Sequence, residues 1–167
     1  MTWQLPRSPP ISADKDLSQL APLPGSKIVF SRYGPQGVLH IVKAPAFHGA
    51  PGLALNNTEV LPEQLIVTLD GHSAGSLYRN SGVQEFGFLD NTTMALAYRL
   101  LTGPSRVLIG PEGGTAGTGL ALYHGVEEIT SLVDNRSLAG IKTAEAAPYT
   151  GNLYQRPDVS LVIATLR

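Results

Sequence analysis

The sequence predicts an α/β fold, α+β overall, in which a small β module precedes the first half of a nucleotide-binding domain. Strand-like runs separated by turn residues fill the first half of the chain, which has Gly 18 and Pro 13 among 167 residues. The stretch from Ser105 to Asn135 then reads as strand, glycine-rich turn, helix, strand and terminal acid, a nucleotide-binding βαβ pattern. Only one further strand, Val159 to Thr165, follows, whereas a doubly wound sheet needs about five. We therefore expect either a fragment or a sheet edge that partner chains cover, with self-association or modest stability.

The composition limits the classes of partner. Hydrophobic residues make up 43%, charged residues 15%, and the net charge of −1 gives no reason to expect nucleic acid or an anionic membrane. Without cysteine there is no disulfide, thiolate metal site or cysteine nucleophile, and the four histidines show no ligand spacing, so no metal is expected. No apolar stretch approaches the roughly 18 residues of a membrane span, and no secretory signal opens the chain. We expect a cytoplasmic protein.

The first half divides into an extended arm and a β module. Residues 1–24 are rich in proline and are predicted to run over the surface, with one helical turn at Asp16–Leu20. Residues 25–84 are predicted to form the β module, with a long loop from Ala44 to Pro62. Its predicted strands are Lys27–Arg32, Val38–Lys43 and Gln64–Asp70.

The second half begins with a linking helix. Residues 85–103 carry apolar side chains that can share one helical face, and Gly103-Pro104 would end the helix. Residues 104–167 are predicted to form the partial nucleoside-binding domain. Its predicted elements are a strand at Val107–Ile109 that is buried on both faces, a helix through Leu120–Tyr123, a strand at Ile129–Val133, a helix near Ser137–Ala147 and the final strand.

The glycine-rich turn and the acid after the next strand form the candidate site. Gly110, Gly113 and Gly114 allow the backbone to approach a ligand, and the following helix offers free N–H groups. Asp134 lies 24 residues after Gly110, near the spacing of about 20 that places an acid on ribose hydroxyls. Two plainer interpretations stay open: the glycines only permit tight packing, and Asp134 caps the next helix together with Asn135.

Glu112 indicates which kind of nucleoside would bind. A carboxylate inside the loop would repel a pyrophosphate, and Gly110-Pro111-Glu112 replaces the first G-x-G of the dinucleotide fingerprint. A nucleoside with a positive centre fits better, such as the sulfonium of S-adenosylmethionine or of its decarboxylated form. The alternative is that Glu112 is a solvated loop acid.

Several segments resemble spermidine synthase-like proteins, that is, polyamine aminopropyltransferases and their relatives. Ile11–Leu20, Ala50–Asn56 and the turn Leu69-Asp70-Gly71 are similar to the subgroup in which this domain is attached to a membrane-spanning segment. In the second half the similarity covers Arg106–Thr130. The resemblance implies an N-terminal β domain followed by a Rossmann-like domain of the S-adenosylmethionine-dependent methyltransferase type, truncated here.

What the resemblance implies for function is a role in polyamine biosynthesis. An aminopropyl group would pass from decarboxylated S-adenosylmethionine to an amine such as putrescine. Independently of the resemblance, the incomplete sheet predicts a homo-oligomer. The loop Gly110–Gly114 and Asp134 would hold the nucleoside, and Glu85 and Asp90 would contact the amine. A plainer interpretation of these last two acids is that they favour a helix N-terminus.

The chain departs from the family pattern at several positions. Gly110-Pro111-Glu112-Gly113-Gly114 stands for Gly-Gly-Gly-Asp-Gly, Leu89 replaces an amine-contacting histidine, and Gly34 and Ala74 replace glutamines. The family's catalytic aspartate, on a fourth strand, would lie beyond Arg167, so no catalytic residue is assigned. Two alternatives therefore remain: methyl transfer from S-adenosylmethionine, and a non-catalytic binding or assembly domain.

Overall fold

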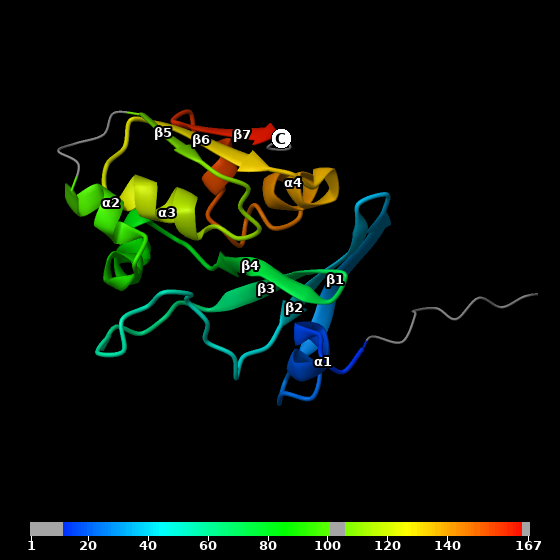
Figure 1. Ribbon diagram of the computed structural model, residues 1–167. Coiled ribbons are helices and arrows are strands. Elements are labelled where there is room, and N and C mark those ends of the chain that lie inside the picture. The colour runs from blue at the N-terminus through cyan, green and yellow to red at the C-terminus, as the bar shows by residue number, and fades with distance from the viewer. Residues whose placement is uncertain (1–11, 101–105, 165–167) are drawn as a thin grey trace, which may run out of the picture.

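Two sheets lie one above the other in the computed structural model, which describes residues 12–100 and 106–164 (Figure 1). The antiparallel sheet comes first in the chain and has the order β1-β2-β3-β4. Its strands are β1 (Lys27–Gly34), β2 (Gly37–Lys43), β3 (Gln64–Leu69) and β4 (His72–Tyr78), preceded by the helix α1 (Asp16–Leu20). The predicted helical turn and the three predicted strands are confirmed.

Strand β4 is absent from the sequence-based prediction. Its residues HSAGSLY do not alternate between apolar and polar, and only Leu77 and Tyr78 at its end are buried. A tight turn joins it to β3, because Asp70 and Gly71 both have positive φ values, 50° and 86°. The Asp70 carboxylate also accepts a hydrogen bond of 2.8 Å from the N–H of Val38, so this acid stabilises the turn region.

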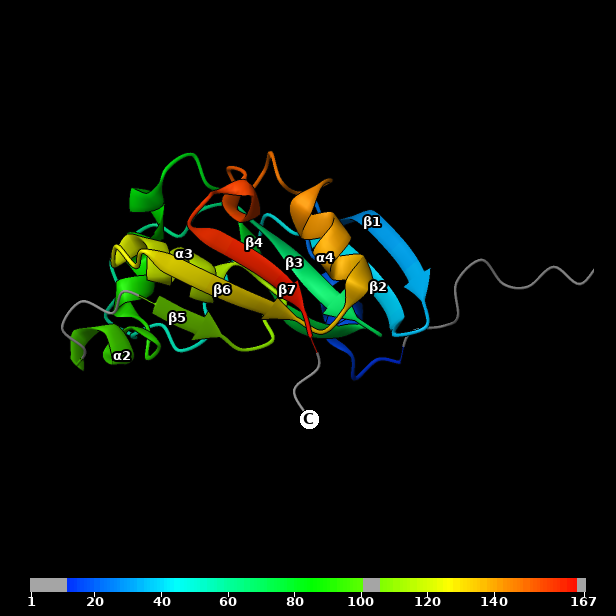
Figure 2. The same cartoon turned by 90° about the horizontal axis from the view of Figure 1, so that it is seen from above.

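The second sheet is parallel and has the order β5-β6-β7 (Figure 2). The elements that lead to it and build it are the 3₁₀ helix η1 (Val83–Asn91), α2 (Ala95–Leu100), β5 (Arg106–Ile109), α3 (Ala116–Tyr123), β6 (Glu128–Val133), α4 (Arg136–Thr143), η2 (Leu153–Gln155) and β7 (Val159–Ile163). The predicted fold class is confirmed: an antiparallel module is followed by parallel strands with helices.

The prediction of one continuous helix over residues 85–103 is wrong. Its first part is η1, and the chain becomes extended at Thr92, with φ −100° and ψ 162°, before α2 begins. Thr92 pairs with Leu53 in an isolated β-bridge, and its hydroxyl donates to the carbonyl of Leu89 at 2.6 Å. The bridge to the distant loop and the local hydroxyl bond both compete with helical hydrogen bonds. The expected stop at Gly103-Pro104 lies outside the described residues.

The prediction that Val107–Ile109 is buried on both faces is also wrong. In the described residues β5 pairs only with β6, so its other edge is open, and Leu108 is 66% exposed. Its apolar sequence would suit the middle of a wider sheet.

A shared core joins the two modules. Leu39 and Val67 of the antiparallel sheet pack in one cluster with Val133 at the end of β6 and Leu138 and Ile141 of α4. A second cluster under α3 contains Phe86, Leu120, Ile129 and Val159. Because of this packing, β4 lies directly beside the glycine-rich turn between β5 and α3. In the part of the chain that the structure describes, no helix is both long and apolar enough to cross a lipid bilayer.

Candidate functional site

A cavity of about 580 Å³ lies between β4 and the turn that joins β5 to α3. Most of its lining is glycine or apolar, and Glu112 is the one charged side chain among the described lining residues. The lining residues are Pro51, Gly52, Ala74, Gly75, Ser76, Tyr78, Thr93, Met94, Ile109, Gly110, Pro111, Glu112, Gly113, Gly114, Ala116 and Gly117. The predicted glycine loop therefore borders a hollow large enough for part of a nucleoside-sized ligand.

The glycine pair packs one side of the turn against β4. A Cβ atom on Gly113 would lie 2.0 Å from the carbonyl oxygen of Ala74, and one on Gly114 would lie 2.3 Å from that of Ser76. The N–H of Thr115 also donates to the Ser76 carbonyl at 3.0 Å. Tight packing is therefore one reason for these two glycines. A Cβ on Gly110, in contrast, would meet nothing within 4 Å, so its side of the turn is open.

Glu112 caps the helix that follows the turn. One carboxylate oxygen accepts a hydrogen bond of 2.5 Å from the N–H of Gly117, and the other accepts one of 2.9 Å from the hydroxyl of Thr118. The side chain thus satisfies a free N–H group in the first turn of α3, where a negative charge is favourable. Glu112 is half-buried and held in place, which is contrary to the interpretation as a solvated loop acid.

Two buried side chains support the turn from the C-terminal elements. The ammonium of Lys142 donates to the carbonyl oxygen of Glu112 at 2.6 Å and lies 5.0 Å from the centre of the Tyr154 ring. The Tyr154 hydroxyl donates to the carbonyl oxygen of Gly114 at 3.1 Å. Burial lowers the pKa of Lys142 to about 8, although Glu112 and Asp134 act in the opposite direction. Burial also raises the pKa of Tyr154.

Sequence reasoning missed Lys142 and Tyr154. The one available signal is helical spacing, because Lys142 follows Leu138 by four residues and so shares the buried face of α4. A single lysine on an apolar face does not reveal which carbonyl it contacts.

Asp134 follows β6 and is exposed. The end of β6 adjoins the turn, since the N–H of Glu112 donates to the carbonyl of Leu132 at 3.0 Å. Asp134 is not among the described residues that line the cavity, and its own carbonyl accepts a hydrogen bond from the Gln36 side chain. Asn135 caps α4, because its side chain accepts from the N–H of Leu138 at 3.0 Å. The contact of Asp134 with a ribose stays a prediction.

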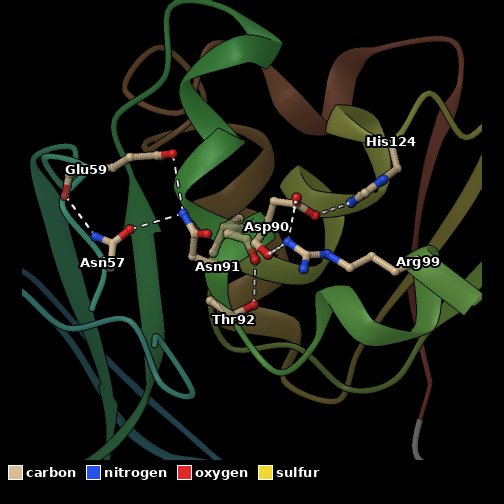
Figure 3. Close-up of polar contacts among 8 residues, drawn as sticks. Asn57, Glu59, Asp90, Asn91, Thr92, Arg99 and His124 are labelled. Carbon is tan, nitrogen blue, oxygen red and sulfur yellow. Dashed lines mark hydrogen bonds and ion pairs between the residues drawn. The ribbon is translucent and has the colours of Figure 1, made fainter. Parts of the chain in front are cut away.

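Glu85 and Asp90 do not line this cavity in the described residues. Glu85 accepts hydrogen bonds from the hydroxyl and the N–H of Ser81, and these bonds lower its pKa. Figure 3 shows Asp90 between Arg99 and His124, each with a nitrogen 2.9 Å from the carboxylate. Burial raises the pKa of Asp90, but Arg99 and His124 outweigh this effect and lower it. Their contact with an amine also stays a prediction.

A polar cluster next to Asp90 anchors the loop that forms one wall of the cavity. The side-chain amide of Asn91 donates to Asn57 at 3.1 Å and to the carboxylate of Glu59 at 3.3 Å (Figure 3). The N–H of Thr93 donates to the carbonyl of Gly52 at 3.0 Å. These bonds fix the segment around Gly52 against the start of α2. These bonds could not be predicted from the sequence, because the partners are more than thirty residues apart.

Within residues 12–100 and 106–164, no three histidine or acidic side chains gather closely enough to hold a metal ion.

Comparison with known proteins identifies the architecture. No protein-family model matches the sequence, and no curated protein matches it. Solved structures do match: a spermidine synthase in complex with the transition state analogue AdoDATO aligns with a TM-score of 0.56, at 15% identity, over 83% of this chain. The chain has a spermidine synthase-like fold. The spermidine synthase from Thermotoga maritima aligns equally well, with a TM-score of 0.55 and 15% identity over 83% of this chain.

The aligned chain spans about two fifths of these synthases, 40% and 42% of their respective lengths. A likeness at 15% identity concerns the spermidine synthase-like fold, in which an antiparallel module precedes parallel strands and helices.

Proposed function

We propose that the cavity beside Glu112 binds an adenosine-type nucleoside that carries a sulfonium, as part of an aminopropyltransferase-like protein. The ligand that fits best is decarboxylated S-adenosylmethionine. The mainly apolar lining suits the uncharged nucleoside, and Glu112 supplies the one negative charge.

The capping contact of Glu112 is the observation that carries the proposal. The free N–H groups at a helix N-terminus form a favourable binding site for phosphate. Here the carboxylate already accepts from Gly117 and Thr118, so a phosphate would compete with it and meet its charge. A sulfonium, in contrast, is attracted to the same carboxylate. This supports a sulfonium nucleoside over a dinucleotide.

The same charge favours the decarboxylated cofactor. S-adenosylmethionine carries a carboxylate that Glu112 would repel. The decarboxylated form lacks this group and keeps the sulfonium and the amino group, which Glu112 would attract. In the proposed reaction, the lone pair of an acceptor amine attacks the carbon next to the sulfonium. A C–N bond forms, the C–S bond breaks with its electron pair going to sulfur, a neutral thioether leaves, and the amine releases a proton to a base.

The remaining predicted residues are part of this proposal. Asp134 would accept hydrogen bonds from the ribose, which is supported by the contact between the end of β6 and the turn at Glu112. Glu85 and Asp90 would hold the acceptor amine only after a rearrangement, since in this structure both are bonded to neighbouring side chains.

Isothermal titration calorimetry of the full chain tests the proposal. We expect binding of decarboxylated S-adenosylmethionine, weaker binding of methylthioadenosine, and no binding of ADP. Glu112→Gln should weaken the sulfonium ligand selectively, and Glu127→Gln, an exposed acid, serves as the matched control. Binding of ADP, or no binding of any nucleoside by the folded chain, would overturn the proposal. Tighter binding of S-adenosylmethionine than of the decarboxylated form would favour methyl transfer.

A further inference from the structure

Lys142 is a buried cation that the proposed reaction does not use. Its side chain has no exposed surface, although lysine is among the residue types least often buried. A buried charge is costly unless it is paired and hydrogen-bonded. Its hydrogen-bond acceptor is the main-chain oxygen of Glu112, in the middle of the glycine-rich turn. The cation therefore acts on the shape of the turn rather than on a surface partner.

Tyr154 completes the same support. Its ring lies against the Lys142 ammonium, and its hydroxyl donates to Gly114, two residues after Glu112. Side chains of α4 and η2 thus hold the carbonyl oxygens of Glu112 and Gly114 in the turn. The opposite side of the turn, at Gly110, faces open space. The support consequently fixes the turn without occupying the cavity.

The negative charges near Lys142 come from two acids that the sequence analysis predicts to contact the ligand. Glu112 and Asp134 both interact electrostatically with its ammonium, and they come from the β5–α3 turn and from the end of β6. Two carboxylates and one ammonium leave a net charge of about −1 around the turn at neutral pH. That balance is complementary to a cationic ligand.

We propose that Lys142 is a positioning residue of the nucleoside site, which holds the glycine-rich turn in its binding shape and sets the charge that a ligand meets. Tyr154 assists it through Gly114. The proposal rests on the proposed function only for the identity of the ligand, because the effect on the turn is present without any ligand.

Amide hydrogen exchange of the full chain tests the first part. Lys142→Met keeps much of the side-chain volume and removes the charge and the donors. We expect exchange of residues 110–118 to become about tenfold faster, whereas β3 should be unchanged. Lys27→Met, on the exposed strand β1, is the matched control and should leave both segments unchanged. Unchanged exchange of residues 110–118 in folded Lys142→Met would overturn the proposal, whether or not the chain binds a nucleoside.

A second variant covers the case in which Lys142→Met does not fold. Tyr154→Phe removes only the hydroxyl that donates to Gly114, and it should speed exchange of the same segment. If its exchange equals that of the unmodified chain, the support from behind the turn is not needed and the proposal fails.

Titration with two nucleosides tests the second part. Without the Lys142 charge, decarboxylated S-adenosylmethionine should gain about fivefold in affinity relative to the neutral methylthioadenosine. A general loss of structure would weaken both ligands equally, so an unchanged ratio contradicts the charge-setting role. If the unmodified chain binds neither nucleoside, the proposed function fails, and the exchange experiment alone decides the role of Lys142.

Discussion

Burial of the Lys142 ammonium should make the stability of the folded chain depend on pH in alkaline solution. Burial lowers the pKa of this group from 10.5 to about 8. The unfolded chain therefore holds this proton more tightly than the folded chain. Stability rises with pH wherever the unfolded state binds more protons. We expect the free energy of unfolding to increase as the pH rises through about 8 toward the pKa of the unfolded chain.

The size of the effect follows from the two pKa values. One pKa unit corresponds to about 1.4 kcal/mol, so the full difference is worth about 3 kcal/mol. Other groups limit the usable range. His40 changes its charge below this pH range, because burial lowers its pKa. The buried tyrosines change the stability mainly above this range. Burial raises the pKa of Tyr78 to about 12 in the folded chain. Above about pH 10 the unfolded chain therefore loses its tyrosine protons before the folded chain does, and the free energy of unfolding falls. Between pH 7 and 9.5 Lys142 alone should add about 2 kcal/mol.

Urea unfolding followed by circular dichroism measures this increase. Between pH 7 and 9.5, the free energy of unfolding of the unmodified chain and of Lys27→Met should rise by about 2 kcal/mol relative to that of Lys142→Met. Two results would refute the reasoning. Stability that stays flat or falls in this range would mean that Lys142 is not a buried cation. An equal rise in Lys142→Met would assign the effect to another group.

Three further substitutions test the site and the sheet edge. Gly113→Ala would place a Cβ 2.0 Å from the Ala74 oxygen. We expect the free energy of unfolding, measured in urea, to fall by roughly 2–4 kcal/mol. A decrease below about 0.5 kcal/mol would show that the turn is not tightly packed. Glu112→Gln should lower the free energy of unfolding by about 1 kcal/mol, because the cap on Gly117 becomes weaker. In calorimetry it should lower the affinity of decarboxylated S-adenosylmethionine relative to methylthioadenosine about fivefold, opposite to Lys142→Met. Equal changes for both ligands would contradict the charge argument. Leu108→Lys, on the open edge of β5, should change the free energy of unfolding by less than about 0.5 kcal/mol. It should also reduce self-association measured by light scattering. A large destabilisation would mean that this side chain is buried.

The elements that sequence analysis located carry a strong local signal. The runs that became β2, β3 and β6 are apolar and rich in β-branched residues, and glycine, proline or acidic residues mark their ends. The order of strand, glycine-rich turn, helix and strand also implied a parallel pair, as β5 and β6 are. The local sequence pattern was sufficient for these elements, because the residues of each one indicate whether it is a strand or a helix.

The parts that the sequence did not reveal depend on distant partners. Strand β4 forms because β3 supplies its ladder, although its own residues have little strand character. The helix break at Thr92 depends on Leu53, and the buried state of Lys142 depends on the carbonyl of Glu112. Tertiary contacts override local propensity in each case, and no spacing rule along the chain identifies the partner.

The packing of the glycine-rich turn is compatible with both interpretations that the sequence left open, tight packing and ligand binding. Gly113 and Gly114 are required for packing, and Gly75 of β4 is required for the same contact, because with φ +141° its Cβ would lie 2.7 Å from the N–H nitrogen of Gly114. Close packing on the β4 side leaves the Gly110 side free to border the cavity. A turn held by β4 on one side and by Lys142 on another has little freedom to adjust, which is what a preorganised binding site needs. The N-terminal sheet is thus a wall of the candidate site, and substitutions at Gly75 should alter nucleoside binding although this residue belongs to the other module.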